Sequence, residues 1–180
     1  MLFATHLLED LKPSGTHETG MATAFTVNGK RVEVTTDAET PLIYALRNEL
    51  GLRGTRFGCG GEDCSACLVI VDQTRRCSCT YLVADAAGKS VQTIEGITGN
   101  IADILREAFV EAGAGQCGYC LSGIFVTAHE LVAGKQRPSI EEVKKSLGRH
   151  LCRCGAHAAI LRGIGKAIDA VDELGGYRND

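Results

Sequence analysis

The pattern of apolar and polar positions changes near residue 99 and divides the chain into two parts. Before that point, short runs of alternating apolar and polar residues are separated by turn residues, which is typical of strands. After it, apolar residues recur every three or four positions, the spacing of helices that bury one face. The change predicts an α+β fold with one domain over residues 23–99 and another over 100–180, preceded by a loose tail over 1–22.

The first domain is expected to open with a β-hairpin and a helix. Alternating residues over 25–34 flank Asn28–Gly29, a dipeptide suited to the type I′ turn of a two-residue hairpin. Thr40 and Pro41 then fit the N-cap and the first position of a helix, because threonine can accept a capping hydrogen bond and proline needs no amide partner there. This helix is predicted to span residues 42–50.

A loop rich in glycine and cysteine follows at residues 58–67, and further strands and helices are expected after it. The strands are predicted at residues 68–71, near 80–83 and near 91–94. Apolar stripes predict four helices in the second domain, at 101–109, 124–132, 140–147 and 160–171. The third of these begins with a capping box formed by Ser139 and Glu142. Four helices of this kind favour a compact, bundle-like domain.

Composition and charge narrow the classes of partner. The chain has 180 residues, of which 44% are hydrophobic and 23% charged, and this composition suits a soluble globular protein. A net charge of −3 without a basic face gives no sign of nucleic-acid binding. No apolar run is long enough to span a bilayer, and Glu9 and Asp10 break the apolar start of the chain before it can form a secretory signal. We therefore expect a cytoplasmic protein without direct membrane insertion.

Nine cysteines are many for a protein of a reducing compartment, where clustered cysteines more often bind metal than form disulfides. The first group, Cys59-x4-Cys64-x2-Cys67 followed by Cys79, has the plant-type spacing of a [2Fe–2S] cluster. Small residues between these cysteines would let the chain wrap tightly around the sulfides. Cys77 is the alternative fourth ligand, but Cys79 is favoured because it leads directly into the next expected strand. Cys77 is then a free thiol.

The second group consists of Cys117-x2-Cys120 and, further along the chain, Cys152-x-Cys154. Four soft ligands in two pairs suit either zinc or an iron–sulfur cluster, and the spacing alone leaves both open. The presence of a plant-type site on the same chain favours a second [2Fe–2S] cluster. Both pairs precede expected helices, whose N-termini stabilise anionic thiolates.

Three motifs together resemble one family. They are Gly58–Cys67, Gln116–Cys120 and Leu151–Gly155, and the resemblance covers roughly residues 23–172. The chain resembles the small iron–sulfur subunit of the molybdenum hydroxylases, the xanthine dehydrogenase/aldehyde oxidase/CO dehydrogenase superfamily. The segment Cys152–His157 looks most like the small subunits of bacterial hydroxylases that act on N-heteroaromatics such as nicotinate, isoquinoline or quinoline.

The resemblance implies a plant-type ferredoxin-like β-grasp domain followed by a four-helix [2Fe–2S] domain. It also implies a non-catalytic subunit of an oxidoreductase, through which electrons pass singly from a molybdenum–molybdopterin dinucleotide in a large partner subunit. They would leave to a flavin such as FAD, a cytochrome haem or another acceptor. By the same resemblance the second cluster lies nearer the molybdenum, and Gln116 contacts the pterin dinucleotide with Cys154 close by. The holoenzyme would hydroxylate an N-heteroaromatic or an aldehyde with oxygen from water.

Two other functions remain to be weighed. A stand-alone ferredoxin-type electron carrier accounts for the first group of cysteines but leaves the second unexplained. A zinc-bearing interaction module would need zinc at the second group.

Overall fold

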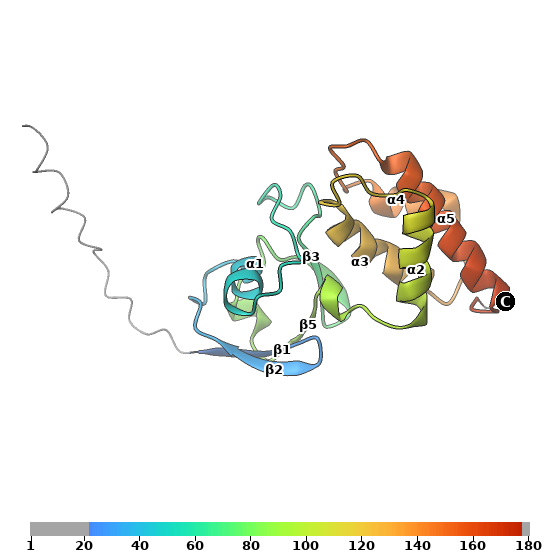
Figure 1. Ribbon diagram of the computed structural model, residues 1–180. Coiled ribbons are helices and arrows are strands. Elements are labelled where there is room, and N and C mark those ends of the chain that lie inside the picture. Colours follow the sequence, from blue (N-terminus) through green and yellow to red (C-terminus); the bar gives the residue numbers. More distant parts are fainter. Residues whose placement is uncertain (1–21, 178–180) are drawn as a thin grey trace, which may run out of the picture.

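The computed structural model describes residues 22–177, which form a small sheet on one side and a group of helices on the other (Figure 1). The strands are β1 Thr23–Val27, β2 Lys30–Val34, β3 Leu68–Val71, β4 Thr74–Cys77 and β5 Ser90–Gln92. The longer helices are α2 Asn100–Glu111, α3 Leu121–Val132, α4 Ile140–Leu147 and α5 His157–Glu173. Shorter helical pieces are α1 Leu42–Tyr44, the π-helix η1 Ala45–Glu49, and the 3₁₀ turns η2 Ala84–Ala86 and η3 Ile94–Gly96. Most of the expected tail, residues 1–21, lies outside the described residues.

The sheet has the strand order β2-β1-β5-β3-β4, with β1 and β5 parallel and the other neighbours antiparallel. Asn28 and Gly29 have positive φ values of 49° and 79°, which confirms the predicted type I′ hairpin. A second hairpin joins β3 to β4 through Asp72 and Gln73, whose φ values of 45° and 65° are also positive. The prediction of a strand near 80–83 is therefore wrong. The chain reverses earlier, directly after β3, and the strand that pairs with β3 is β4.

The first helix begins differently from the sequence prediction. Pro41, and not Thr40, occupies the N-cap, and no side chain accepts a capping hydrogen bond there. The Leu42 amide instead donates to the Tyr81 carbonyl at 2.7 Å, so a neighbouring loop satisfies the helix N-terminus. The helix then widens into the π-helical segment η1 over 45–49. The capping box of α4 is confirmed, since the Ser139 and Glu142 side chains each accept from the other's backbone amide.

Two apolar cores lie side by side. One is formed mainly by α2, α3, α4 and α5, and the other by the inner face of the sheet with α1 and η1. The predicted helical stripes are confirmed, since Leu105, Ile124 and Ile160 are all fully buried in the first core. No helix within residues 22–177 is both long and apolar enough to cross a membrane.

The helices meet the cysteine loop through a backbone contact at Gly123 near the start of α3. A Cβ atom placed on Gly123 would lie 1.8 Å from the carbonyl oxygen of Ser65, far closer than any real contact. The neighbouring Ser122 hydroxyl donates a buried hydrogen bond of 2.7 Å to the Ala66 carbonyl. Because only glycine permits this approach, α3 and the 58–67 loop are held together at backbone distance.

We expect Gly123→Ala to lower the free energy of unfolding by about 3 kcal/mol or more, because the new methyl group overlaps a backbone oxygen that cannot rotate away. For a chain of this size that corresponds to a fall of about 6–12 °C in the thermal midpoint. The measurement is thermal unfolding followed by circular dichroism.

Gly165→Ala in α5 is the matched control, since a Cβ atom there meets nothing within 4 Å. This second variant should be as stable as the parent or gain about 1 kcal/mol from alanine's higher helix propensity. Equal midpoints for the two variants would contradict the close contact at Gly123.

Candidate metal centres

The loop that carries the first cysteines is wound so that its backbone amides point at sulfur. The amides of Gly61, Asp63 and Cys64 lie 3.2–3.4 Å from the Cys59 sulfur, and the Cys59 amide lies 3.3 Å from the Cys64 sulfur. Gly60 has a φ of +74°, which glycine adopts without strain, and the chain turns around the sulfur there. The hydrogen bond from Gly61, aided by those from the other amides, lowers the pKa of Cys59 to about 7. The loop is therefore built to hold negative charge on sulfur.

Cys67 and Cys79 complete the first group from the buried side. Cys67 precedes β3 and Cys79 follows β4, and their thiols are in hydrogen-bonding contact. Burial raises the pKa of Cys79 to about 11. The pKa of Cys67 is raised as well, first by its hydrogen bond to the Cys77 thiol and then by burial. Both sulfurs therefore need a cation, such as iron, to remain thiolates in this environment.

Cys77 approaches this group more closely than the sequence suggested. It ends β4 and is partly buried, and its thiol contacts that of Cys67. The sequence predicted that Cys79 leads into a strand, but it lies in a turn. The Ser78 hydroxyl holds this turn by donating to the Cys67 carbonyl at 2.7 Å. Five thiols thus surround the first centre, of which four have the plant-type spacing.

The second group gathers where two helices begin. Cys120 is the N-cap of α3, and the Ala156 amide at the start of α5 lies 3.4 Å from the Cys152 sulfur. The Cys117 thiol contacts that of Cys154, and the Cys120 thiol contacts that of Cys152. Burial raises the pKa of Cys120 to about 12, whereas the Tyr119 amide and the Cys154 thiol lower that of Cys117.

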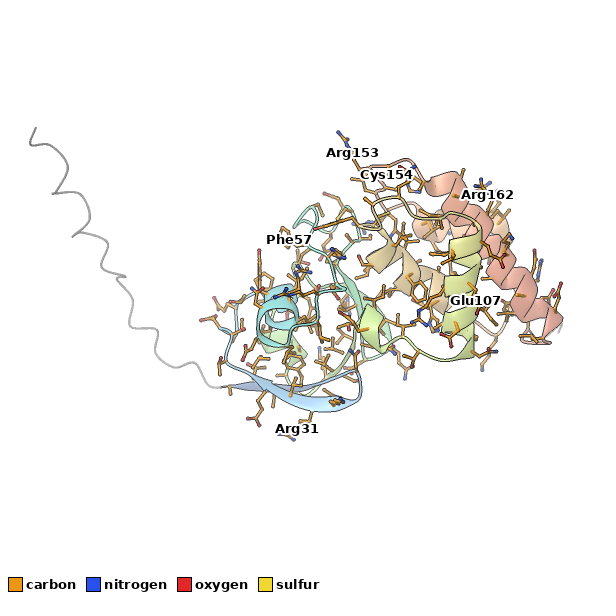
Figure 2. The ribbon with its side chains drawn as sticks, viewed as in Figure 1. Arg31, Phe57, Glu107, Arg153, Cys154 and Arg162 are labelled. Atoms are coloured by element: carbon orange, nitrogen blue, oxygen red, sulfur yellow. The ribbon has the colours of Figure 1, made fainter. Side chains whose placement is uncertain are left out.

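Gln116 lies in the loop between α2 and α3 and is exposed, as is its neighbour Cys117. Cys154 lies beside Arg153 at the upper edge of the molecule (Figure 2). These residues are accessible to a partner, as a contact with a group in another subunit requires.

Each group supplies four cysteine thiols, which fits the donor set of a [2Fe–2S] cluster with two ligands on each of two irons. Four thiols also suit a structural zinc ion, so the donor set alone leaves both metals open.

The two centres are joined by contacts that the sequence did not reveal. The Leu151 amide, next to Cys152, donates to the Cys64 carbonyl at 3.3 Å. The Tyr119 hydroxyl, between the cysteines of the second group, donates to the Phe57 carbonyl beside the first loop. Phe57 and Cys154 accordingly lie towards the same end of the molecule (Figure 2). These contacts end on backbone carbonyls, which every residue carries, so residue types alone could not have predicted them.

Comparison with known proteins gives matches for both halves. Residues 25–90 match the family of the 2Fe-2S iron-sulfur cluster binding domain, and residues 93–165 match that of the [2Fe-2S] binding domain. One subunit of nicotinate dehydrogenase from Pseudomonas putida is 42% identical over 144 residues, which cover 79% of this chain and 92% of the relative. The alpha subunit of isoquinoline 1-oxidoreductase from Brevundimonas diminuta is 37% identical over 144 residues, which cover 79% of this chain and 95% of the relative.

A solved structure has the same overall shape. Quinoline 2-oxidoreductase from Pseudomonas putida 86 contains a chain that superimposes with a TM-score of 0.77 at 31% identity, covering 88% of this chain and 99% of that one. Two cluster-binding families, relatives matched over most of their length and this shared fold all indicate one family. The chain therefore belongs to the iron–sulfur small subunits of the molybdenum hydroxylases, the family of xanthine dehydrogenase and aldehyde oxidase, and is part of an oxidoreductase.

Proposed function

We propose that this chain carries electrons one at a time from a molybdopterin site in a large partner subunit to a flavin, a cytochrome or another acceptor. The observation that carries the proposal is the gathering of two separate sets of four cysteines on either side of one backbone contact. A [2Fe–2S] group supplies one-electron exchange when bound. The chain's own residues hold each group, exclude water from its buried side and fix the distance between the two centres.

The proposed ligands of the first cluster are Cys59, Cys64, Cys67 and Cys79, and those of the second are Cys117, Cys120, Cys152 and Cys154. Thiols that are in contact would share an iron. Cys67 contacts both Cys77 and Cys79, and the plant-type spacing selects Cys79 as its partner. The same reasoning pairs Cys117 with Cys154 and Cys120 with Cys152. Backbone amides directed at the sulfurs would stabilise the negative charge that reduction adds.

We assign two domains, residues 23–99 with a ferredoxin-like β-grasp fold and residues 100–180 with four helices. The two apolar cores support this division, and Leu68 and Ile97 of the first domain also pack into the core of the helices. The second domain would face the large subunit, because exposed Gln116 lies beside the second centre and is suited to contact the pterin dinucleotide. The nine cysteines without disulfides suit a cytoplasmic location.

We infer the substrate class of the holoenzyme from the names of two relatives. They are named for nicotinate and isoquinoline, both aromatic rings that contain nitrogen. We assign to the holoenzyme the hydroxylation of an N-heteroaromatic or aldehyde carbon with oxygen from water, at a site in the partner subunit. No residue of this chain takes part in that reaction at the substrate.

Substitution of single cysteines should distinguish the cluster ligands from Cys77, which we expect not to be a ligand. The parent protein should contain about four irons per chain and show two [2Fe–2S] signals by EPR after reduction with dithionite. Cys64→Ser and Cys120→Ser should each lose one signal, a different one in each variant, together with about half of the iron.

Cys77→Ser is the matched control and should retain both signals, because the four plant-type ligands remain. Zinc instead of iron at the second centre, or loss of the first cluster in Cys77→Ser, would contradict the ligand assignment.

The purified complex should also distinguish an enzyme component from a free carrier. If the chain conducts electrons from the partner's active site, anaerobic addition of nicotinate, isoquinoline or an aldehyde should reduce both clusters without dithionite. The measurement is EPR of samples frozen at successive times after mixing. Recovery of the chain without any molybdenum-containing subunit, or clusters that stay oxidised with every substrate of these classes, would exclude the proposed role.

A further inference from the structure

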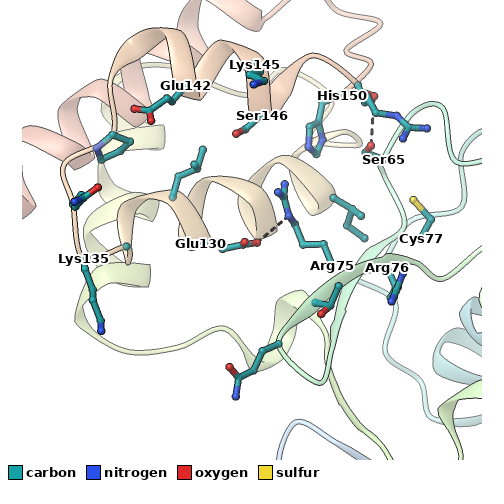
Figure 3. Close-up of a pocket in the computed structure, with 18 of the residues that line it drawn as sticks. Ser65, Arg75, Arg76, Cys77, Glu130, Lys135, Glu142, Lys145, Ser146 and His150 are labelled. Atoms are coloured by element: carbon teal, nitrogen blue, oxygen red, sulfur yellow. Dashed lines mark hydrogen bonds and ion pairs between the residues drawn. The ribbon is translucent and has the colours of Figure 1, made fainter.

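A groove of about 1300 Å³ lies on the molecule between β4 and the helices α3 and α4 (Figure 3). At one end it reaches Ser65 and Cys77 of the first centre and His150 just before the second. At the other end it is bordered by the 134–138 segment between α3 and α4. A molecule bound in this groove would therefore touch both halves of the chain beside the cysteines.

One wall of the groove is the free edge of the sheet. β4 is the last strand in the sheet order, and among the described residues it pairs only with β3. The consecutive residues 73–77 all line the groove, although successive side chains of a strand point to opposite faces. The groove must therefore follow the backbone edge of β4 and not only one of its faces.

The hairpin geometry sets which backbone groups are open. In a two-residue hairpin the flanking residues, here Val71 and Thr74, exchange both ladder hydrogen bonds. The next residue, Arg75, is then in a non-hydrogen-bonded pair with Ile70, so its amide and carbonyl point away from β3. An edge with such groups is a template for pairing with another extended segment.

The groove is basic although the chain as a whole has a net charge of −3. Three carboxylate side chains line it, against six cations, which are Arg75, Arg76, Lys135, Arg137, Lys145 and Arg149. Arg75 is paired with Glu130 at 2.9 Å across the groove (Figure 3). Arg76, Lys135 and Lys145 have no carboxylate within 4.0 Å in the part of the chain that the structure describes. These three exposed cations are available to an anionic partner.

We propose that this groove binds an extended, acidic segment of a partner subunit, which adds a strand to β4 and pairs its carboxylates with Arg76, Lys135 and Lys145. A polypeptide satisfies both features of the groove at once, because its backbone pairs with the edge of β4 and its side chains project to both faces of the sheet. The Arg75 side chain faces α3, so Arg76 lies on the opposite face of β4, and the two rows of side chains on the added strand would reach Arg76 on one face and the two lysines on the other. A phosphate polymer offers no backbone amide donors, so it cannot pair with the open Arg75 carbonyl on the edge of β4. The inference rests on the proposed function only in requiring that the chain works within a complex of subunits.

The test uses the full chain with both clusters and a fluorescein-labelled peptide of about eight residues in which adjacent pairs of glutamates are separated by pairs of valines, so that both faces of the added strand carry carboxylates. Fluorescence anisotropy should show binding that weakens as salt is raised. The double variant Arg76→Glu/Lys145→Glu should bind at least about tenfold more weakly, because two attractive charges become repulsive.

The matched control is Lys30→Glu/Arg31→Glu on β2, the edge strand at the opposite side of the sheet. It makes the same change in net charge on an exposed edge and should leave peptide binding unchanged. If both double variants weakened peptide binding equally, the loss would come from overall charge and not from the groove, and the proposal would be overturned. Equal binding of an oligonucleotide of about eight bases, with the same dependence on Arg76 and Lys145, would overturn the assignment to a polypeptide.

Hydrogen exchange tests the strand pairing directly. Bound peptide should slow exchange of the Arg75 amide, and binding without that protection would overturn the addition of a strand to β4. In the purified complex, Arg76→Glu/Lys145→Glu should lower the salt concentration at which a partner subunit dissociates, while both EPR signals remain. Unchanged dissociation would refute the groove as a subunit contact and would leave the electron-transfer role intact, so the two proposals fail separately.

Discussion

The close approach of α3 to the 58–67 loop is the contact on which both metal centres depend. At Gly123 the helix backbone touches the Ser65 carbonyl, and Ser122 donates to the next carbonyl along the loop. The same helix begins at Cys120 and so carries a ligand candidate of the second centre. One glycine thus positions the first loop against the element that starts the second centre. Each half of the chain is small, and this contact makes the two apolar cores support one another.

The sequence allowed most of the site to be predicted, because ligand spacing is a local property of the chain. The pattern from Cys59 to Cys79 identifies a plant-type cluster without any knowledge of the fold. The second group could be assigned only beside the first, since its spacing also suits zinc. The structure adds the pairing of thiols, which depends on how α3 and α5 meet and has no counterpart in the spacing.

Where the predictions were wrong, tertiary contacts overrode local preference. Asp72 and Gln73 form a type I′ turn although glutamine rarely adopts positive φ, so turn chemistry gave no sign of β4. The Thr40 cap was not used because the Tyr81 carbonyl already accepts from the helix N-terminus. The contact of Cys77 with Cys67 was missed for a related reason, since it follows from the position of β4. The four longer helices and the capping box of α4 were predicted correctly, because apolar stripes and caps are signals within one contiguous segment of the chain.

The link between Leu151 and Cys64 joins main chain to main chain, so no side-chain rotamer enters it. A separation fixed by backbone atoms on both sides does not vary as side chains change conformation. In the proposed role, such a joint would keep the distance between the two centres independent of side-chain conformation. Because electron tunnelling falls steeply with distance, the rate of transfer between them would then be insensitive to the conformations of the surrounding side chains.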